Sequence, residues 1–249
     1  MNLLFTICGR AGSKGIKNKN IKDFLGKPLA LYTLTTIDLT IKKGFEDHDC
    51  DIVVNSDSEE LIDILTHTNL GKVEVIKRDE SLAGDKVAKM DVIKNCLEEM
   101  ELRLDKKYDL IIDLDITSPL RTPKDVINII EEKINSDYDL VFSVTPSRRN
   151  PYFNMVLKGE NGYERVIASD FTARQEAPLI YDMTGSIYVY SRDMLLTKRN
   201  LFDGKCGIYE MEDTGVLDLD RENDLLLMEI IGDYLIKNKE EFKEIYDNI

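Results

Sequence analysis

A loop rich in glycine and basic residues follows the first apolar run of the chain. Residues 3–8 read LLFTIC, and residues 9–20 then read GRAGSKGIKNKN. From Arg10 to Lys27 the chain carries six basic residues and one acid, Asp23, whereas the whole chain has a formal net charge of −14. An apolar run that breaks into glycines predicts a buried strand that ends in a tight loop with open backbone N–H groups. These features together predict a site for a polyphosphate, such as a nucleoside triphosphate.

The spacing of the glycines separates this loop from two common nucleotide-binding motifs. A Walker loop requires Gly-Lys followed directly by Ser or Thr, but here the order is Ser13, Lys14, Gly15. The dinucleotide fingerprint requires G-x-G-x-x-G, but here the glycines fall at positions 9, 12 and 15. Neither motif fits. For this run alone, a solvated basic surface loop stays open as the alternative.

Carboxylates two positions apart form the second feature that could carry chemistry. Asp218 and Asp220 flank one leucine, and Asp113 and Asp115 flank another. Two such carboxylates on an extended segment point to the same face, which suits Mg²⁺, an ion that needs one or two carboxylates beside phosphates and water. For the first pair, the alternative is that Asp218 faces solvent while Asp220 caps a helix beginning at Arg221. The second pair competes for the metal role.

The composition limits the classes of protein that need to be considered. The chain has 249 residues, 43% of them hydrophobic, which is enough for one large α/β domain. No apolar run approaches the ~20 residues of a membrane span, so we expect a cytoplasmic protein. The acidity argues against nucleic acid and membrane surfaces as partners. Four scattered cysteines predict reduced thiols, and two histidines make serine–histidine or metal–histidine chemistry improbable.

Alternating patterns predict the elements that must position these residues. We expect strands over residues 3–8, 51–55, 73–76, 110–114 and 140–144, and helices over residues 29–42, 58–65, 86–101 and 123–135. Such alternation indicates right-handed βαβ units and a mostly parallel sheet in a doubly wound, three-layer fold. Ligands of such sheets bind beyond the carboxyl ends of the strands. The Asn55-Ser56-Asp57 segment lies there, although we favour it as a helix N-cap, and so does Arg121, which could simply pair with an acid.

The alternation of predicted strands and helices ends after residue 150. Residues 155–158 and 163–167 predict a hairpin with Asn161 and Gly162 at its turn. Further strands are expected over residues 186–190 and 207–210, and a closing helix over residues 225–236. We therefore expect a single domain over residues 1–249, with an extension at about residues 146–184.

Taken together, several segments resemble the CMP-nonulosonic acid synthetases, also called acylneuraminate cytidylyltransferases. They occur in family order and span nearly the whole chain, at residues 10–20, 55–57, 78–82, 117–121, 174–175, 185–188 and 218–220. The resemblance implies a nucleotide-diphospho-sugar transferase-like fold and a reaction in which the anomeric hydroxyl of a nine-carbon sugar acid attacks the α-phosphorus of CTP. It also implies a homodimer whose hairpin extension completes the partner's sugar pocket.

The resemblance also implies roles for individual residues. The catalytic residues would be Lys19, Asp218 and Arg10, with Mg²⁺ held by Asp218 and Asp220. The nucleotide would be bound by Arg10, Gly12, Ser13, Lys14, Lys19, Asn20 and Arg78. The sugar would be bound by Asp115, Arg121, Arg174, Thr184 and Tyr188. With the metal lowering the pKa of the sugar hydroxyl, no histidine base would be needed.

Two departures from the sialic acid enzymes fall in the expected sugar pocket. Asp115 stands where those enzymes often carry glutamine, and Thr184 where they often carry asparagine. The strings at residues 112–115, 148–153 and 181–183 look more like the bacterial legionaminic acid branch. An extra acid would suit a sugar with an additional acetamido N–H, and legionaminic acid is therefore the favoured substrate, with sialic acid as the alternative.

Three other interpretations are open. An enzyme for the eight-carbon acid KDO would carry Arg-Leu-Pro-Gly-Lys after the loop serine, where this chain has Lys-Gly-Ile-Lys-Asn-Lys. A redox enzyme with a dinucleotide fold lacks its glycine fingerprint here. A non-catalytic nucleotide sensor would need the loop but neither Asp218 nor Asp220.

Overall fold

The computed structural model describes residues 1–12, 16, 18–84 and 86–249. Seven strands of this described chain form one sheet in the order β11-β7-β10-β6-β1-β4-β5. Only β10 runs antiparallel to its neighbours in that sheet. The sheet strands are β1 (Asn2–Cys8), β4 (Asp49–Ser56), β5 (Val73–Lys77), β6 (Leu110–Leu114), β7 (Leu140–Pro146), β10 (Tyr181–Ser191) and β11 (Cys206–Glu210). The predicted mostly parallel sheet is confirmed.

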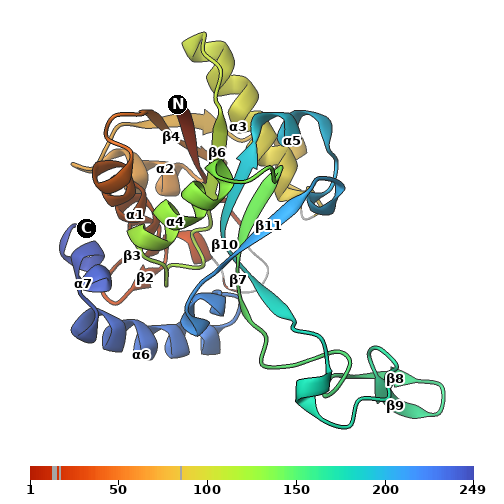
Figure 1. The fold of residues 1–249 in the computed structure, drawn as a ribbon. Helices are drawn as coiled ribbons and strands as arrows, with labels where there is room; N and C mark the ends of the chain where they lie inside the picture. The colour runs from red at the N-terminus through yellow and green to blue at the C-terminus, as the bar shows by residue number, and fades with distance from the viewer. Residues whose placement is uncertain (13–15, 17, 85) are drawn as a thin grey trace.

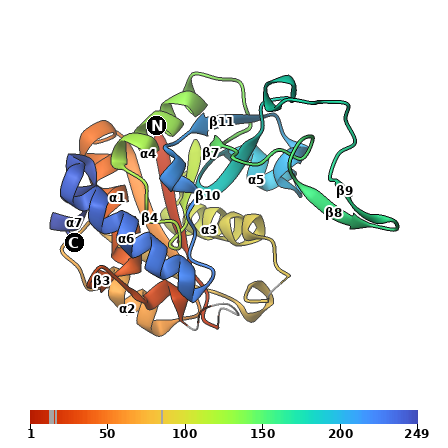
Figure 2. The ribbon, with the colours of Figure 1, turned by 90° about the horizontal axis from the view of Figure 1, so that it is seen from below.

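Helices cover both faces of the sheet, as Figures 1 and 2 show. They are α1 (Leu29–Gly44), α2 (Glu59–Thr66), α3 (Lys89–Leu104), α4 (Pro123–Ile134), α5 (Arg192–Thr197), α6 (Glu222–Asn238) and α7 (Glu240–Asp247). Strand β1 shows how the layers form. Leu3 and Phe5 belong to the apolar cluster that includes residues of α1, α2, α4, α6 and α7, whereas Leu4 belongs to the cluster that includes residues of α3 and α5. The predicted three-layer, doubly wound architecture is confirmed.

A small arm projects from the body on the extended ends of β7 and β10 (Figure 1). Its strands β8 (Val156–Gly159) and β9 (Gly162–Arg165) form a separate two-stranded sheet. Another such pair, β2 (Asp23–Phe24) and β3 (Lys27–Pro28), precedes α1. The arm's turn lies at residues 160–161, one residue before the predicted position. Gly162 has φ +121° and pairs with Gly159, so it belongs to the strand rather than to the turn.

Some predicted boundaries and elements differ from the structure. Strand β10 begins five residues before the predicted strand, because Gly185 (φ +69°) and a register shift between Met183 and Tyr188 interrupt its sequence pattern. Helix α3 begins at Lys89 rather than at residue 86, since Ala88 is extended. Helices α5 and α7 and the short strands β2 and β3 were not predicted. No helix in the described residues is long and apolar enough to cross a membrane.

Candidate active site

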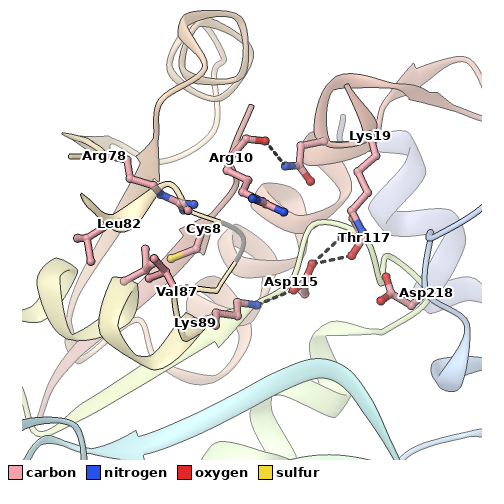
Figure 3. Close-up of a pocket in the computed structure, with 13 residues that line it drawn as sticks. Cys8, Arg10, Lys19, Arg78, Leu82, Val87, Lys89, Asp115, Thr117 and Asp218 are labelled. Atoms are coloured by element: carbon pink, nitrogen blue, oxygen red, sulfur yellow. Dashed lines mark hydrogen bonds and ion pairs between the residues drawn. The ribbon is translucent and has the colours of Figure 1, made fainter. Parts of the chain in front are cut away.

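A cavity of about 270 Å³ opens at the carboxyl ends of β1, β5 and β6, where the sheet topology predicts a ligand site. Figure 3 shows its lining side chains converging from three directions. Predicted site residues that line it are Arg10, Lys19, Asn20, Arg78, Asp115 and Asp218. Its other walls come from Cys8, Leu82, Gly84, Val87, Lys89, Val92 and Thr117. The cavity is therefore cationic on one wall and acidic on another.

The cationic wall is held in place by backbone and amide contacts. Arg78 follows β5 and donates from Nε to Oδ1 of Asn55 at 2.7 Å and from Nη2 to the Asn55 carbonyl at 2.9 Å. Lys19 donates from Nζ to the Leu219 carbonyl at 3.0 Å. Asn20 donates from Nδ2 to the Arg10 carbonyl at 3.1 Å, a bond visible in Figure 3. These contacts bring together cations that lie far apart in the sequence.

The glycine loop is anchored at its start by β4 and the residues after it. The Ala11 N–H donates to Oδ1 of Asp57 at 2.7 Å, and Gly12 has φ +71°, a conformation that favours glycine. The N-cap of α2 is Ser58, whose Oγ accepts from the Leu61 N–H at 3.2 Å. Asp57 therefore fixes the loop rather than capping the helix. The predicted nucleotide ligands Ser13 and Lys14 lie outside the described residues.

The acidic wall is built around a lysine that bridges two aspartates. Lys89 Nζ lies 2.8 Å from Oδ2 of Asp113 and 2.6 Å from Oδ2 of Asp115. Burial by itself lowers the pKa of Lys89, but the two carboxylates outweigh burial and raise that pKa well above its ordinary value. Burial likewise raises the pKa of Asp115, but Lys89 and Thr117 reverse this and hold it well below the usual range. Asp115 is therefore an ionised hydrogen-bond acceptor at neutral pH.

Asp218 and Asp220 lie beside the cationic wall. Oδ1 of Asp220 is 3.2 Å from Nζ of Lys19, and the Asp220 side chain is 70% exposed. Helix α6 begins at Glu222 with Arg221 as its N-cap, so Asp220 does not cap it. Asp218 lines the cavity, and its buried Oδ1 makes no hydrogen bond within the described part of the chain. Burial raises the pKa of Asp218 above its ordinary value.

Four predicted sugar-binding residues lie outside this cavity: Arg121, Thr184, Arg174 and Tyr188, the last of which lines a second cavity described below. Arg121 is fully buried and donates to the carbonyls of Asp115 and Ser118, both at 2.7 Å. Thr184 is 2% exposed, and its hydroxyl lies 2.6 Å from that of Ser143. Their enclosure does not support direct contact with a sugar. Arg174 is exposed near the base of the arm, where Nη2 donates to the Ser147 carbonyl at 3.0 Å.

Comparison with known proteins assigns the family. Residues 4–241 match the family described as cytidylyltransferase. The chain belongs to that family. It is 35% identical to the post-translational flagellin modification protein B of Campylobacter coli, over 95% of this chain and 96% of that protein. It is 34% identical to the CMP-N,N′-diacetyllegionaminic acid synthase of Campylobacter jejuni, over 92% of this chain and 94% of that protein.

The fold of this cytidylyltransferase also matches solved structures. A CMP-2-keto-3-deoxy-manno-octonic acid synthetase in complex with CTP superposes with a TM-score of 0.65, covering 94% of this chain and 99% of that one at 14% identity. At that identity the likeness concerns the fold alone. The predicted nucleotidyltransferase fold is thereby confirmed.

A second cavity of about 230 Å³ adjoins the first through a shared residue, Lys89. The predicted sugar-binding residue Tyr188 lines it. The other lining residues are Ala88, Met90, Tyr190, Arg199, Asn200 and Leu201. Lys89 Nζ lies 6.0 Å from the centroid of the Tyr188 ring. The cytidylyltransferase thus has a polar cavity and a more apolar one side by side.

Sequence reasoning missed Lys89 entirely. Its position at the first turn of a helix, where a cation is electrostatically unfavourable, is the one local signal that could have drawn attention to it. The pairing itself depends on where the start of α3 meets the end of β6. That arrangement is tertiary, and no spacing in the sequence encodes it.

Proposed function

We propose that this cytidylyltransferase transfers CMP from CTP to the anomeric hydroxyl of a nonulosonic acid and releases pyrophosphate. The observation that carries the proposal is the cavity at the strand ends, with Arg10, Lys19 and Arg78 on one wall and Asp115 and Asp218 on another. The cationic wall suits a triphosphate, and the acidic wall suits a metal and a sugar. The name of the Campylobacter jejuni relative favours a legionaminic acid as the acceptor.

Catalysis by this cavity would consist mainly of positioning and charge stabilisation. Negative charge grows on the non-bridging and leaving oxygens as pyrophosphate departs, and cations already aimed at them need not reorganise. Lys19 and Arg10 would stabilise that charge, because both line the cavity beside the glycine loop. Arg78, fixed by Asn55, would orient the nucleotide.

The acidic residues fit a magnesium ion. Oδ1 of Asp218 is buried without a hydrogen bond in the described chain, which a bound cation would satisfy. Among the described residues, no three His, Cys, Asp or Glu side chains converge as a closed metal site, and Mg²⁺ does not need one, since it keeps water and phosphate ligands. Asp218 and Asp220 would hold the ion, which supplies charge neutralisation at phosphate and a lower pKa for the attacking hydroxyl.

The sugar would occupy the second cavity and the boundary between the two cavities. Tyr188 offers an aromatic surface there, and Asp115 offers an acceptor for a hydroxyl or acetamido N–H. Arg121 and Thr184 would act indirectly. Arg121 binds the carbonyl of Asp115 and so fixes the backbone of the sugar-facing segment.

The arm would pair with a second copy of the chain and carry Arg174 toward the partner's site. Its apolar side chains are unusually open, with Val156 62% exposed, Leu179 72% and Tyr163 77%. Exposed apolar side chains gathered on a projecting hairpin favour an interface. Arg174 does not line either cavity of its own chain. A homodimer would give this cation a sugar carboxylate to bind.

Pyrophosphate release from CTP, measured with legionaminic, pseudaminic, sialic and KDO acids and with Mg²⁺ present or chelated, tests the proposal. We expect Mg²⁺-dependent release that is fastest with legionaminic acid. A preference for sialic acid would reject legionaminic acid as the substrate but keep the reaction. CTP binding without release for any acid would reject catalysis.

A further inference from the structure

We propose that Lys89 is a positioning residue that fixes the Asp115 carboxylate for the sugar acid. The inference rests on the proposed function and concerns a residue to which the family resemblance gives no role. Lys89 is the one residue that lines both cavities described above. A ligand that spans from the nucleotide cavity to the Tyr188 cavity must therefore pass its side chain.

The ammonium of Lys89 is committed to two carboxylates. Its Nζ donates a hydrogen bond to Asp115 at 2.6 Å and forms an ion pair with Asp113 at 2.8 Å, and its side chain remains 35% exposed. Asp113 is fully buried and also accepts from the Thr6 hydroxyl at 2.8 Å, so it is anchored in the sheet. Lys89 consequently links the Asp115 carboxylate to a carboxylate that is buried within β6.

Asp115 is held from both sides. Its Oδ1 accepts from the Thr117 N–H at 3.0 Å and from the Thr117 hydroxyl at 2.8 Å, while Oδ2 faces Lys89. These bonds, visible in part in Figure 3, occupy three of about four acceptor positions of the carboxylate. The one remaining acceptor position of the carboxylate has a fixed direction, and it can accept a hydrogen bond but not donate one. Asp115 therefore presents one oriented acceptor to a hydroxyl or amide N–H of the sugar.

The dipole of α3 strengthens the case that Lys89 is placed for its partners. Lys89 is the first residue of this 16-residue helix, where the positive end of the dipole disfavours a cation. The two carboxylates compensate for this unfavourable position. An uncharged residue would be more favourable for the helix at this position, so we infer that the lysine is placed to pair with Asp113 and Asp115.

The test measures steady-state kinetics of pyrophosphate release for Lys89→Met, which keeps the chain length but removes the charge. The acceptor is N,N′-diacetyllegionaminic acid, or sialic acid if the wild-type enzyme uses it faster. We expect the KM for the sugar to rise about tenfold or more, while the KM for CTP changes less than about twofold. Lys89→Arg should recover part of the loss. Lys94→Met is the matched control, since Lys94 lies on the same helix, 37% exposed, beside Glu98.

Two further variants separate positioning from folding. Lys89→Met leaves Asp113 buried without its cation, so Lys89→Met combined with Asp113→Asn removes the buried charge pair together. When Lys89→Met and Asp113→Asn are added to Asp115→Asn, the KM for the sugar should rise by less than about twofold over that of Asp115→Asn alone. The reason is that Lys89 acts through Asp115. The inference is overturned if the combined change raises the sugar KM equally in the presence and absence of the Asp115 carboxylate. It is also overturned if Lys89→Met leaves the sugar KM unchanged. Absence of wild-type release with every acid would overturn the proposed function and this inference with it.

Discussion

Nζ of Lys19 lies 3.2 Å from Oδ1 of Asp220, 201 residues further along the chain. The expected phosphate ligand and the expected metal ligand thus meet directly before either substrate arrives. Lys19 also donates to the Leu219 carbonyl, so the segment that carries both aspartates is fastened to the end of the glycine loop. Binding of a triphosphate and a metal would replace this ion pair with two others, one between Lys19 and a phosphate and one between Asp220 and the metal.

Lys19→Ala should lower kcat for pyrophosphate release by roughly 10²–10³, because one well-aimed cation is lost from the departing pyrophosphate. Lys42→Ala is the control, since Lys42 forms a 2.6 Å ion pair with Asp38 on α1 and lines neither cavity. Urea unfolding should show both variants folded. Near-normal turnover in Lys19→Ala would remove Lys19 from the catalytic residues.

Asp218→Asn should raise the Mg²⁺ concentration needed for half-maximal activity by at least about tenfold, since one of the two proposed metal-binding carboxylates is lost. The same change should leave the midpoint of thermal unfolding unchanged or higher in metal-free buffer. The reason is that Oδ1 of Asp218 is buried without a hydrogen bond in the described chain, and the amide carries no charge. Asp233→Asn, at an exposed pair with Lys237, serves as control. An unaltered Mg²⁺ requirement would contradict the metal assignment.

Arg121→Met should destabilise the fold by about 3 kcal/mol or more, because the buried carbonyls of Asp115 and Ser118 and the Thr33 hydroxyl each lose a charged donor. Burial lowers the pKa of this guanidinium to about 10, which leaves it charged at neutral pH. Arg103→Met, whose parent side chain is 41% exposed, should cost less than about 1 kcal/mol. Urea unfolding curves compare them. Equal stability of the two variants would argue that Arg121 does not hold the strand ends together.

The stability of the protein should fall in acid partly through Glu101. Its carboxylate contacts Arg192 at 2.7 and 2.9 Å and Lys107 at 2.8 Å, and these partners lower its pKa to about 2. The folded pKa is depressed, so the contribution is complete above the unfolded value of about 4.3 and is lost as the pH falls toward 2.

Urea unfolding of Glu101→Gln between pH 7 and pH 3 measures this contribution. The wild type should exceed the variant by about 3 kcal/mol at pH 7, and roughly half of that difference should vanish by pH 3. Glu98→Gln on the same helix, at a side chain that is 55% exposed, is the control. A difference that stays constant with pH would show that the ion pairs do not account for it.

Mixing two inactive variants tests whether Arg174 acts across a dimer. Lys19→Ala and Arg174→Ala should each lose activity, but after subunit exchange one site in each mixed dimer would have Lys19 of its own chain and the partner's arm intact. About a quarter of wild-type activity should then return for a random 1:1 mixture of C2 dimers. No recovery, with exchange verified by mass spectrometry, would place Arg174 in the site of its own chain or outside any site.

Local signals account for what could be predicted from the sequence. Strand Leu110–Leu114 matches its prediction because a fully buried strand is a mostly apolar run, which here only Asp113 interrupts. Helix α4 begins at Pro123 as predicted, since Thr122 and Asp125 form a capping box that can be recognised by spacing alone. The glycine loop and the paired aspartates can likewise be recognised from the types and spacing of a few neighbouring residues.

Tertiary contacts account for what could not be predicted. Arg121 follows a polar segment in the sequence, yet Thr33 and Ser186 from distant elements enclose it. Thr184 is turned inward because it bonds to Ser143 across the β7–β10 pair. Residue type and spacing show that such residues could bind a ligand, but which side of the backbone faces the cavity depends on strand pairing.

Strand β10 has a mechanical consequence. Its first residues, Tyr181–Met183, pair with the outer end of β7 and form the stem of the arm, while Tyr188 further along borders the second cavity. The two are joined by four residues that contain the register shift and Gly185. A force applied to the arm is thus transmitted along one covalent strand to the wall of the cavity. Strand β10 therefore connects the projecting arm directly to the second cavity.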